Sequence, residues 1–259
     1  MIKKIINKLR ALKNIIVKFI KKLTKKKIDI KKSWENEPSK RTDMVDFLNW
    51  FDATDSIDST KTRATADWTK RLSNFEGYNN LNKNQSLEIG FGGGRLVMQA
   101  AKEFKIANGV DIHSNFTMTE KFLQSENCSN YNLVHRDDIN NIEDNSIDMV
   151  YSFVVFQHFD TFEEVKFYLD FIKRVLKKDG VAHIFFGKAK DEQEIKEVSA
   201  KEFNTRACSL FVKPKAFYDY VEGQGFEILE TEDRMRKYLD KEGIEGNESG
   251  QARVLFKKK

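Results

Sequence analysis

A glycine cluster between a short apolar strand and a helix constrains this chain more than any other feature. The run Ser86–Ile89 has the apolar character of a strand, four glycines follow within Gly90–Gly94, and helical spacing begins at Arg95. Glycine allows positive φ and lets a ligand approach the backbone without meeting a Cβ, while the N–H groups of a helix start face the same point. The stretch therefore predicts a strand, a tight loop and a helix that hold a nucleotide-like ligand.

The spacing of these glycines disfavours a dinucleotide site. Gly90 and Gly92 fit the pattern G-x-G-x-x-G, but the third glycine position is Arg95. That glycine permits close packing of helix on strand in dinucleotide-binding folds. A nicotinamide-dependent oxidoreductase is therefore only an alternative enzyme hypothesis.

Composition bounds the class of protein. With 259 residues and 40% hydrophobic residues, the chain can build one domain with a substantial core, plus appendages. The two cysteines, Cys128 and Cys208, lie far apart without metal-ligand spacing, which argues against a zinc site or a disulfide framework. We expect no metal and a reducing, cytoplasmic location.

Strand and helix signals alternate after the glycine loop, which is typical of a doubly wound sheet with parallel strands. Strands are predicted at 86–89, 104–112, 131–136, 146–158 with its exit loop, 181–187, 227–230 and 251–256. Helices are predicted at 95–101, 115–126, 163–177 with a stop at Gly180, 191–206 and 214–226, and an exposed loop at 235–250.

The segment before the glycine loop is expected to be a helical cap or linker. Residues 31–40 read as a polar link, Asp43 is placed to cap a helix over 42–51, and a second helix is expected over 64–75. Trp50 and Trp68 are interpreted as core aromatics or as residues of a lid.

Several motifs in order resemble class I S-adenosylmethionine-dependent methyltransferases, over residues 81–259. Glu88–Gly94 is similar to motif I of that family, and Asp111 follows Gly90 by 21 positions, at the end of the second strand. Asp137–Asp138 ends the third strand, and Asp144–His158 looks like the family's fourth motif.

The resemblance implies a Rossmann-like, doubly wound seven-stranded α/β sheet with an antiparallel last strand, and S-adenosylmethionine as cofactor. It places Gly90 and Gly92 around the methionine and ribose, Glu88 beneath the turn, and Asp111 on the ribose hydroxyls. Asp137 or Asp138, with Asp138 favoured, would accept from the adenine amino group. The full set of implied cofactor-binding residues is Glu88, Gly90, Phe91, Gly92, Gly94, Asp111, Ile112, Asp137, Asp138, Ile139 and Phe153.

The implied reaction is in-line transfer of a methyl group to an unidentified small-molecule, glycan or lipid acceptor. His158, at the end of the fourth strand, would face the acceptor either as a general base or as a residue that orients the loop. The alternative outside enzymology is a catalytically silent module of the same fold that binds a membrane or a protein partner.

The N-terminal arm, residues 1–32, differs in charge from the rest. It has 13 Lys or Arg and one acidic residue, whereas the remainder has a net charge of −7, which disfavours nucleic acid. The longest uncharged run in residues 1–27 is Asn14–Val17, too short for a membrane span or a secretory signal. A helix would gather its apolar residues on one face: Ile2, Ile5, Ile6, Leu9, Leu12, Ile16, Phe19, Ile20 and Leu23.

Such a basic amphipathic helix suits an anionic membrane surface, a protein surface or, less well, nucleic acid. Binding to a membrane would place the protein peripherally at the inner membrane face. The chain thus divides into the basic helix at 1–32, the cap or linker at 33–80 and the methyltransferase-like domain at 81–259.

Overall fold

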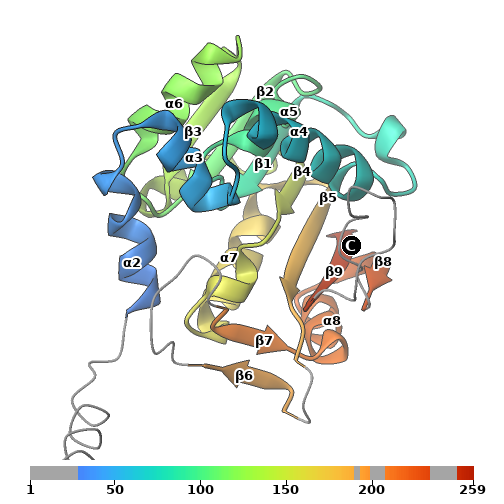
Figure 1. The fold of residues 1–259 in the computed structure, drawn as a ribbon. Helices are drawn as coiled ribbons and strands as arrows, with labels where there is room; N and C mark the ends of the chain where they lie inside the picture. Colours follow the sequence, from blue (N-terminus) through green and yellow to red (C-terminus); the bar gives the residue numbers. More distant parts are fainter. Residues whose placement is uncertain (1–28, 190–192, 199–207, 234–249) are drawn as a thin grey trace, which may run out of the picture.

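A seven-stranded sheet in the order β3-β2-β1-β4-β5-β9-β8 organises the molecule, as Figure 1 shows. The computed structural model describes residues 29–189, 193–198, 208–233 and 250–259. Strands β1 to β5 run parallel, and β9 is antiparallel to both of its neighbours. The strands are β1 (Gln85–Ile89), β2 (Ile106–Asp111), β3 (Tyr131–His135), β4 (Ile147–Ser152), β5 (Leu176–Gly187), β8 (Phe226–Glu232) and β9 (Gln251–Lys258). The predicted doubly wound sheet with an antiparallel last strand is confirmed.

Helices cover both faces of the sheet. One face carries α3 (Met44–Asp52), α4 (Ile57–Asp67), α5 (Arg95–Ala100) and α6 (Phe116–Ser125), and the other carries α7 (Phe162–Val175) and α8 (Pro214–Gly223). Shorter elements are α2 (Ile30–Asn36), η1 (Pro38–Lys40), the π-helical η2 (Trp68–Leu72), η3 (Tyr78–Asn80), η4 (Arg136–Asn141) and η5 (Phe156–His158). A separate pair of strands is formed by β6 (Ile195–Glu197) and β7 (Leu210–Val212).

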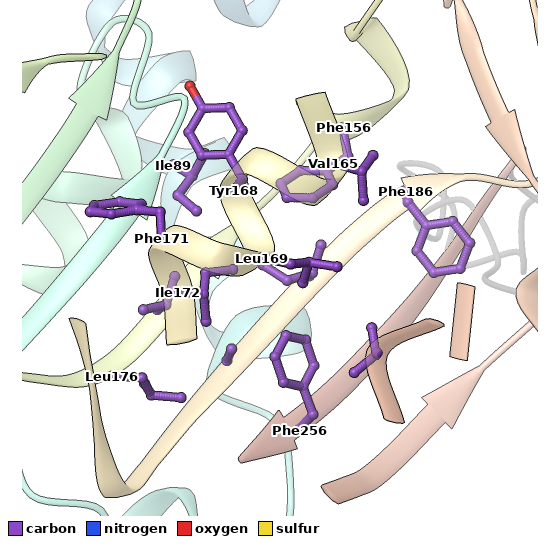
Figure 2. Packing of buried hydrophobic residues seen from close by; sticks show 14 of the residues in the cluster. Ile89, Phe156, Val165, Tyr168, Leu169, Phe171, Ile172, Leu176, Phe186 and Phe256 are labelled. Carbon is purple, nitrogen blue, oxygen red and sulfur yellow. The ribbon is translucent and has the colours of Figure 1, made fainter. Parts of the chain in front are cut away.

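Two hydrophobic cores lie on the two faces because side chains alternate along each strand. On β5, Ile184 and Phe186 belong to the core under α7 and α8, whereas Phe185 belongs to the core under α3 to α6. Figure 2 shows Leu169 and Ile172 of α7 packed in the first of these cores. Both faces of the central strands are therefore dry, which explains their continuous apolar runs.

The segment before the glycine loop forms a cap, here defined as α2, α3, α4 and η2 (residues 30–72). Asp43 caps α3 as predicted, since its side chain accepts from the Asp46 N–H at 2.9 Å. Trp68 is buried against Tyr151 and is a core residue, whereas half-buried Trp50 packs on Trp34 at 4.8 Å between ring centroids.

Three expectations about local structure are wrong. The expected polar link at 31–40 is largely α2, because Asp29 caps it by accepting from the Lys32 N–H, and buried Ile30 anchors it. The helix expected over 64–75 begins earlier, at Ile57, where the Ser56 side chain accepts from the Ser59 N–H. Residues 195–197 are a strand rather than part of a helix, because they pair with β7.

The expected helix stop at Gly180 is also wrong, because α7 ends at Val175 and β5 begins at once with Leu176. Gly180 lies within β5, where a Cβ would come within 2.8 Å of the Ile147 carbonyl oxygen.

Other expectations fall outside the described residues: the amphipathic helix at residues 1–28, most of 191–206, and the loop up to residue 249. Among the described helices, none combines the length and apolar character needed to cross a bilayer.

His183 of β5 is a buried, neutral histidine that links the cap to the neighbouring strand β9. Its Nδ1 lies 3.2 Å from the Leu72 carbonyl oxygen, and its Nε2 lies 3.1 Å from Nη1 of Arg253. A neutral ring satisfies both contacts, donating from Nδ1 and accepting at Nε2. Burial, aided by Arg253, lowers the pKa of His183 to about 3.

This lowered pKa predicts a stability that falls with acidification. In the unfolded chain His183 takes up a proton near pH 6.5, whereas the folded state resists protonation until about pH 3. Stability from this residue is complete above pH 6.5 and decreases below it, by about 2 kcal/mol at about pH 5. Urea unfolding at about pH 7.5 and about pH 5 measures this loss in the free energy of unfolding. In His183→Gln the difference between the two pH values is expected to be about 2 kcal/mol smaller. An unchanged pH dependence in His183→Gln would contradict the assignment.

Candidate functional site

The glycine loop between β1 and α5 has a backbone that only glycine fits. Gly90 and Gly92 have φ of 79° and 51°, in the left-handed region that side chains disfavour. A Cβ on Gly90 would overlap the Val155 side chain, and one on Gly92 would lie 2.9 Å from a ring carbon of Phe51. The loop is therefore packed between the exit of β4 and the cap.

Asp111, at the end of β2, holds the glycine loop through hydrogen bonds of its carboxylate. Its Oδ2 accepts from the Gly92 N–H at 2.8 Å, and its Oδ1 accepts from the N–H groups of Ile112 and His113 at 2.7 and 3.2 Å. These bonds hold the carboxylate in one orientation at the edge of the sheet. Asp111 is half-buried, so it remains accessible to a ligand above it.

His113 orients the same loop and was missed by sequence reasoning. Its Nδ1 accepts from the Asn115 N–H at 3.1 Å, so Nε2 carries the proton and donates to the Gly92 carbonyl at 3.1 Å. Burial lowers the pKa of His113, which keeps this neutral tautomer. The available signal was its position two residues after Asp111.

An open cavity of about 1070 Å³ lies over the carboxyl ends of β1, β2 and β4. Eight of the twelve sequence-predicted residues line it: Glu88, Gly90, Phe91, Gly92, Asp111, Ile112, Phe153 and His158. The position agrees with the rule that open α/β sheets bind ligands at the carboxyl ends of their strands.

The other four predicted residues do not line this cavity. Gly94 is the N-cap of α5, with φ of 87°. Asp137 and Asp138 are exposed on η4, and Ile139 of the same turn is buried in the core under α7. The structure thus brings the residues after β1, β2 and β4 together but leaves those after β3 at the margin.

Glu88 is the buried acid beneath the turn. Only 2% of it is exposed, and the Tyr151 hydroxyl lies 3.5 Å from its Oε2. Burial raises the pKa of Glu88 well above its usual range, against the opposing effect of the Arg95 charge. This carboxyl group is a buried acceptor on the cavity floor.

The exit of β4 is strained where it meets the cavity. Val154 has φ of 63°, which is unusual for a β-branched residue and costs on the order of 1 to 3 kcal/mol. The strained turn leads into η5, where buried His158 lies with its ring centroid 5.1 Å from that of Trp34. Strain of this kind is commonly found at binding sites, where it places a side chain that relaxed backbone would not.

A second wall of the cavity comes from α2 and α7 and was not predicted. Lys31 and Trp34 line it from α2, while Glu164 and Tyr168 line it from α7. Nη2 of Arg136 pairs with Glu164 Oε2 at 2.6 Å. Trp34 was not predicted as a site residue because residues 31–40 were predicted to be a link. The signal was present, since Ile30 and Trp34 have the i, i+4 spacing of one helix face after the capping residue Asp29.

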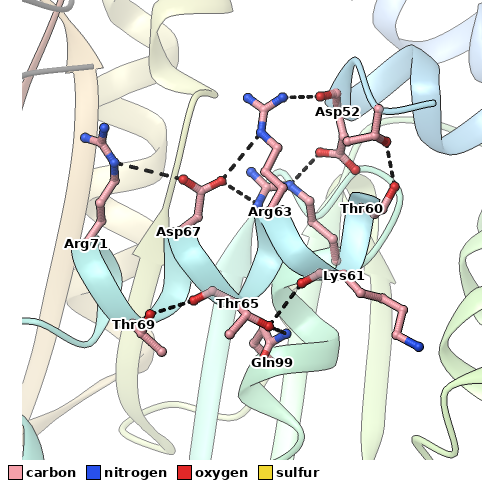
Figure 3. Close-up of polar contacts among 11 residues, drawn as sticks. Asp52, Thr60, Lys61, Arg63, Thr65, Asp67, Thr69, Arg71 and Gln99 are labelled. Atoms are coloured by element: carbon pink, nitrogen blue, oxygen red, sulfur yellow. Dashed lines mark hydrogen bonds and ion pairs between the residues drawn. The ribbon is translucent and has the colours of Figure 1, made fainter. Parts of the chain in front are cut away.

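Arg95 connects the glycine loop to the cap. It begins α5, and its buried guanidinium donates from Nε to Asp52 Oδ1 at 2.5 Å and from Nη1 to Asp67 Oδ2 at 2.7 Å. Asp52 ends α3 and Asp67 ends α4. Figure 3 shows Asp67 between Arg63 and Arg71, the two flanking cations of α4 and η2. The residue that breaks the dinucleotide pattern thus has a structural role.

The described residues contain no group of three or more His, Cys, Asp or Glu that could hold a metal ion. Neither Cys128 nor Cys208 forms a disulfide.

Comparisons with known proteins agree with this fold. Residues 87–184 match the family model described as a methyltransferase domain. The PH0226 protein from Pyrococcus horikoshii OT3 is similar in structure, with a TM-score of 0.58 at 17% identity over 82% of this chain and 96% of that one. An S-adenosylmethionine-dependent methyltransferase from Clostridium acetobutylicum ATCC 824 gives 0.52 at 16% identity over 76% and 98%.

The cyclase SpnF also has this fold, with a TM-score of 0.53 at 12% identity over 78% of this chain and 81% of that one. No curated protein matches the sequence. Because identities this low establish only the fold, the domain match carries the assignment to a class. Residues 87–184 therefore belong to a methyltransferase domain.

Proposed function

We propose that this methyltransferase binds S-adenosylmethionine at the glycine-loop end of the cavity and a methyl acceptor at the end lined by Trp34 and His158. One observation carries the proposal: a single cavity joins Asp111 and the glycine loop to the wall formed by α2 and α7. The residues present fit the cofactor, since the backbone at Gly90 and Gly92 excludes any Cβ and Asp111 offers a fixed carboxylate.

In this proposal the chain acts by binding, orienting and excluding water. The cofactor supplies an electrophilic methyl group on sulfur, open to in-line displacement. Asp111 accepts from the ribose hydroxyls, the loop at Gly90 and Gly92 lies along the methionine and ribose, and Phe91, Ile112 and Phe153 supply apolar contacts. Holding donor and acceptor in line contributes most of the rate acceleration. Asp138, with Asp137 and Ile139 beside it, remains our prediction for the adenine contact.

The cofactor assignment is tested by calorimetry with S-adenosylmethionine. Wild type is expected to bind, and Asp111→Ala to bind at least about tenfold more weakly, since it loses two charge-assisted hydrogen bonds. Asp179→Ala, an exposed acid of β5, is the matched control and is expected to bind like wild type. Equal affinities for all three proteins would contradict the role of Asp111.

His158 is proposed as the general base that accepts a proton from the acceptor. It is buried, lines the cavity and lies beside Trp34, where an acceptor would stack. With an identified acceptor, His158→Asn is expected to lower the rate about 10²- to 10⁴-fold at neutral pH. The variant should also lose the acidic limb of the pH–rate profile. Retention of that limb would assign His158 to loop orientation instead.

The acceptor is proposed to be a small molecule, a glycan or a lipid. The last residues of the basic arm, 30–32, are the first residues of α2, and we propose that the arm lies on an anionic membrane surface. Since Lys31 and Trp34 of α2 line the cavity, a surface that holds the arm would lie near the site. This arrangement favours a lipid or a membrane-linked glycan as acceptor.

Co-sedimentation with anionic vesicles tests the arm. The full chain is expected to sediment with them, less so as salt is raised, because each basic residue near the surface contributes about 1 kcal/mol that salt screens. Deletion of residues 1–27 is expected to abolish sedimentation while cofactor binding persists. Equal sedimentation of the truncated chain would reject the anchor.

A further inference from the structure

Asp52 is a buried acid of the cavity that the glycine motif does not explain. It is 8% exposed at the end of α3 and lines the cavity with the glycine loop. Its Oδ1 accepts from Arg95 Nε, whereas its Oδ2 is buried without a hydrogen-bond partner. A buried carboxylate oxygen without a hydrogen-bond donor is costly, and such oxygens are rare in folded proteins.

The unpartnered oxygen faces the glycine loop. A Cβ built on Gly93 would lie 3.8 Å from Asp52 Oδ2, beside Cδ2 of Leu48 and Cδ2 of Phe51 at 2.8 and 3.7 Å. Arg95 donates to Asp52 only at Oδ1 and is shared with Asp67, which also pairs with Arg63 and Arg71. Burial raises the pKa of Asp52, and Arg95 only partly opposes this. What Asp52 Oδ2 lacks is therefore a hydrogen-bond donor, which a ligand group with N–H donors can supply.

Given the proposed function, we propose that Asp52 Oδ2 accepts a hydrogen bond from the α-ammonium group of S-adenosylmethionine. Gly90 and Gly92 adjoin the methionine end of the cofactor, and Gly93 follows them, whereas Asp111 adjoins the ribose. The sulfonium has no hydrogen to donate, so the ammonium is the cationic group that can satisfy this oxygen. The cap thereby becomes part of the cofactor site, and Asp52 is a binding residue.

Asp67 is a matched comparison within the same cluster. It also accepts from Arg95, at 2.7 Å, and is fully buried, but it does not line the cavity. Both carboxylates hold Arg95 in place, so loss of either charge disturbs the cluster alike. Only Asp52 would also contact the ligand. Comparing variants of the two residues therefore distinguishes a loss of ligand contact from a loss of structural support for Arg95.

The test is calorimetry of Asp52→Asn with three ligands. The amide oxygen can still accept from Arg95, but the charge is lost and an N–H₂ group would face the ammonium. Affinity for S-adenosylmethionine and S-adenosylhomocysteine is expected to fall about tenfold or more. Affinity for 5′-methylthioadenosine, which lacks the amino-acid end, is expected to stay within about twofold, since it makes no contact there. Asp67→Asn is expected to bind all three ligands within about twofold of the wild-type affinity, while its melting temperature falls.

Three results would overturn the proposal: unchanged S-adenosylmethionine affinity in Asp52→Asn, an equal loss for 5′-methylthioadenosine, or the same selective loss in Asp67→Asn. Should Asp52→Asn fail to fold, the wild type can be titrated with S-adenosylhomocysteine and with its des-amino analogue. Equal affinities of the wild type for these two ligands would also overturn the proposal. If wild type binds none of these ligands, the proposed function fails first. If wild type binds them and the variant behaves alike, only the role of Asp52 fails.

Discussion

The buried pairing of Arg95 with Asp52 and Asp67 is the interaction on which the arrangement of the site depends. One guanidinium joins the start of α5 to the ends of α3 and α4, which are 43 and 28 positions away in sequence. Taking these charges out of water is costly, and removing one partner of such a set typically costs about 3 to 5 kcal/mol. The cap therefore cannot leave the glycine loop without exposing or unpairing these charges.

The glycine loop is fixed from its other side by hydrogen bonds that converge on Gly92. Its N–H donates to Asp111, and its carbonyl accepts from Nε2 of His113 and from the Thr119 hydroxyl at 3.0 Å. Three elements, β2, the turn after it and α6, thus determine one residue. Because the loop is set by the protein, little ordering is left for a ligand to impose, which favours tight binding.

The cavity itself is a joint product of the sheet and the cap. The strand ends supply Glu88, Asp111 and His158, whereas α2 and α3 supply Trp34, Phe51 and Asp52. The strand-end groups are those expected for a cofactor, and the cap groups come from the segment that precedes the glycine loop. A division of this kind lets one fold serve many acceptors, because the chemistry stays on the sheet and selectivity lies in the covering segment.

Local signals determined most of the sheet. Apolar runs, glycines and the Asp43 cap are short-range features, so β1, β2, α3, α6 and the site residues after β1, β2 and β4 could be predicted from the sequence. The order of strands and the antiparallel β9 followed from a family resemblance, not from propensity. By contrast, α2, the early start of β5 at Leu176 and the β6–β7 pair depend on partners distant in the chain, and their own sequences read equally well as link, helix cap or helix.

What the sequence determined by itself is the glycine loop after β1 and the acid at the end of β2, because glycine at positive φ and a carboxylate at a strand end are local features. Only the tertiary structure shows how the cap packs over this edge of the sheet. Arg95 in sequence merely broke a glycine pattern, and its contacts with Asp52 and Asp67 exist only after folding. The unpartnered oxygen of Asp52 and the placement of Trp34 beside His158 follow from the same burial, which no local pattern encodes.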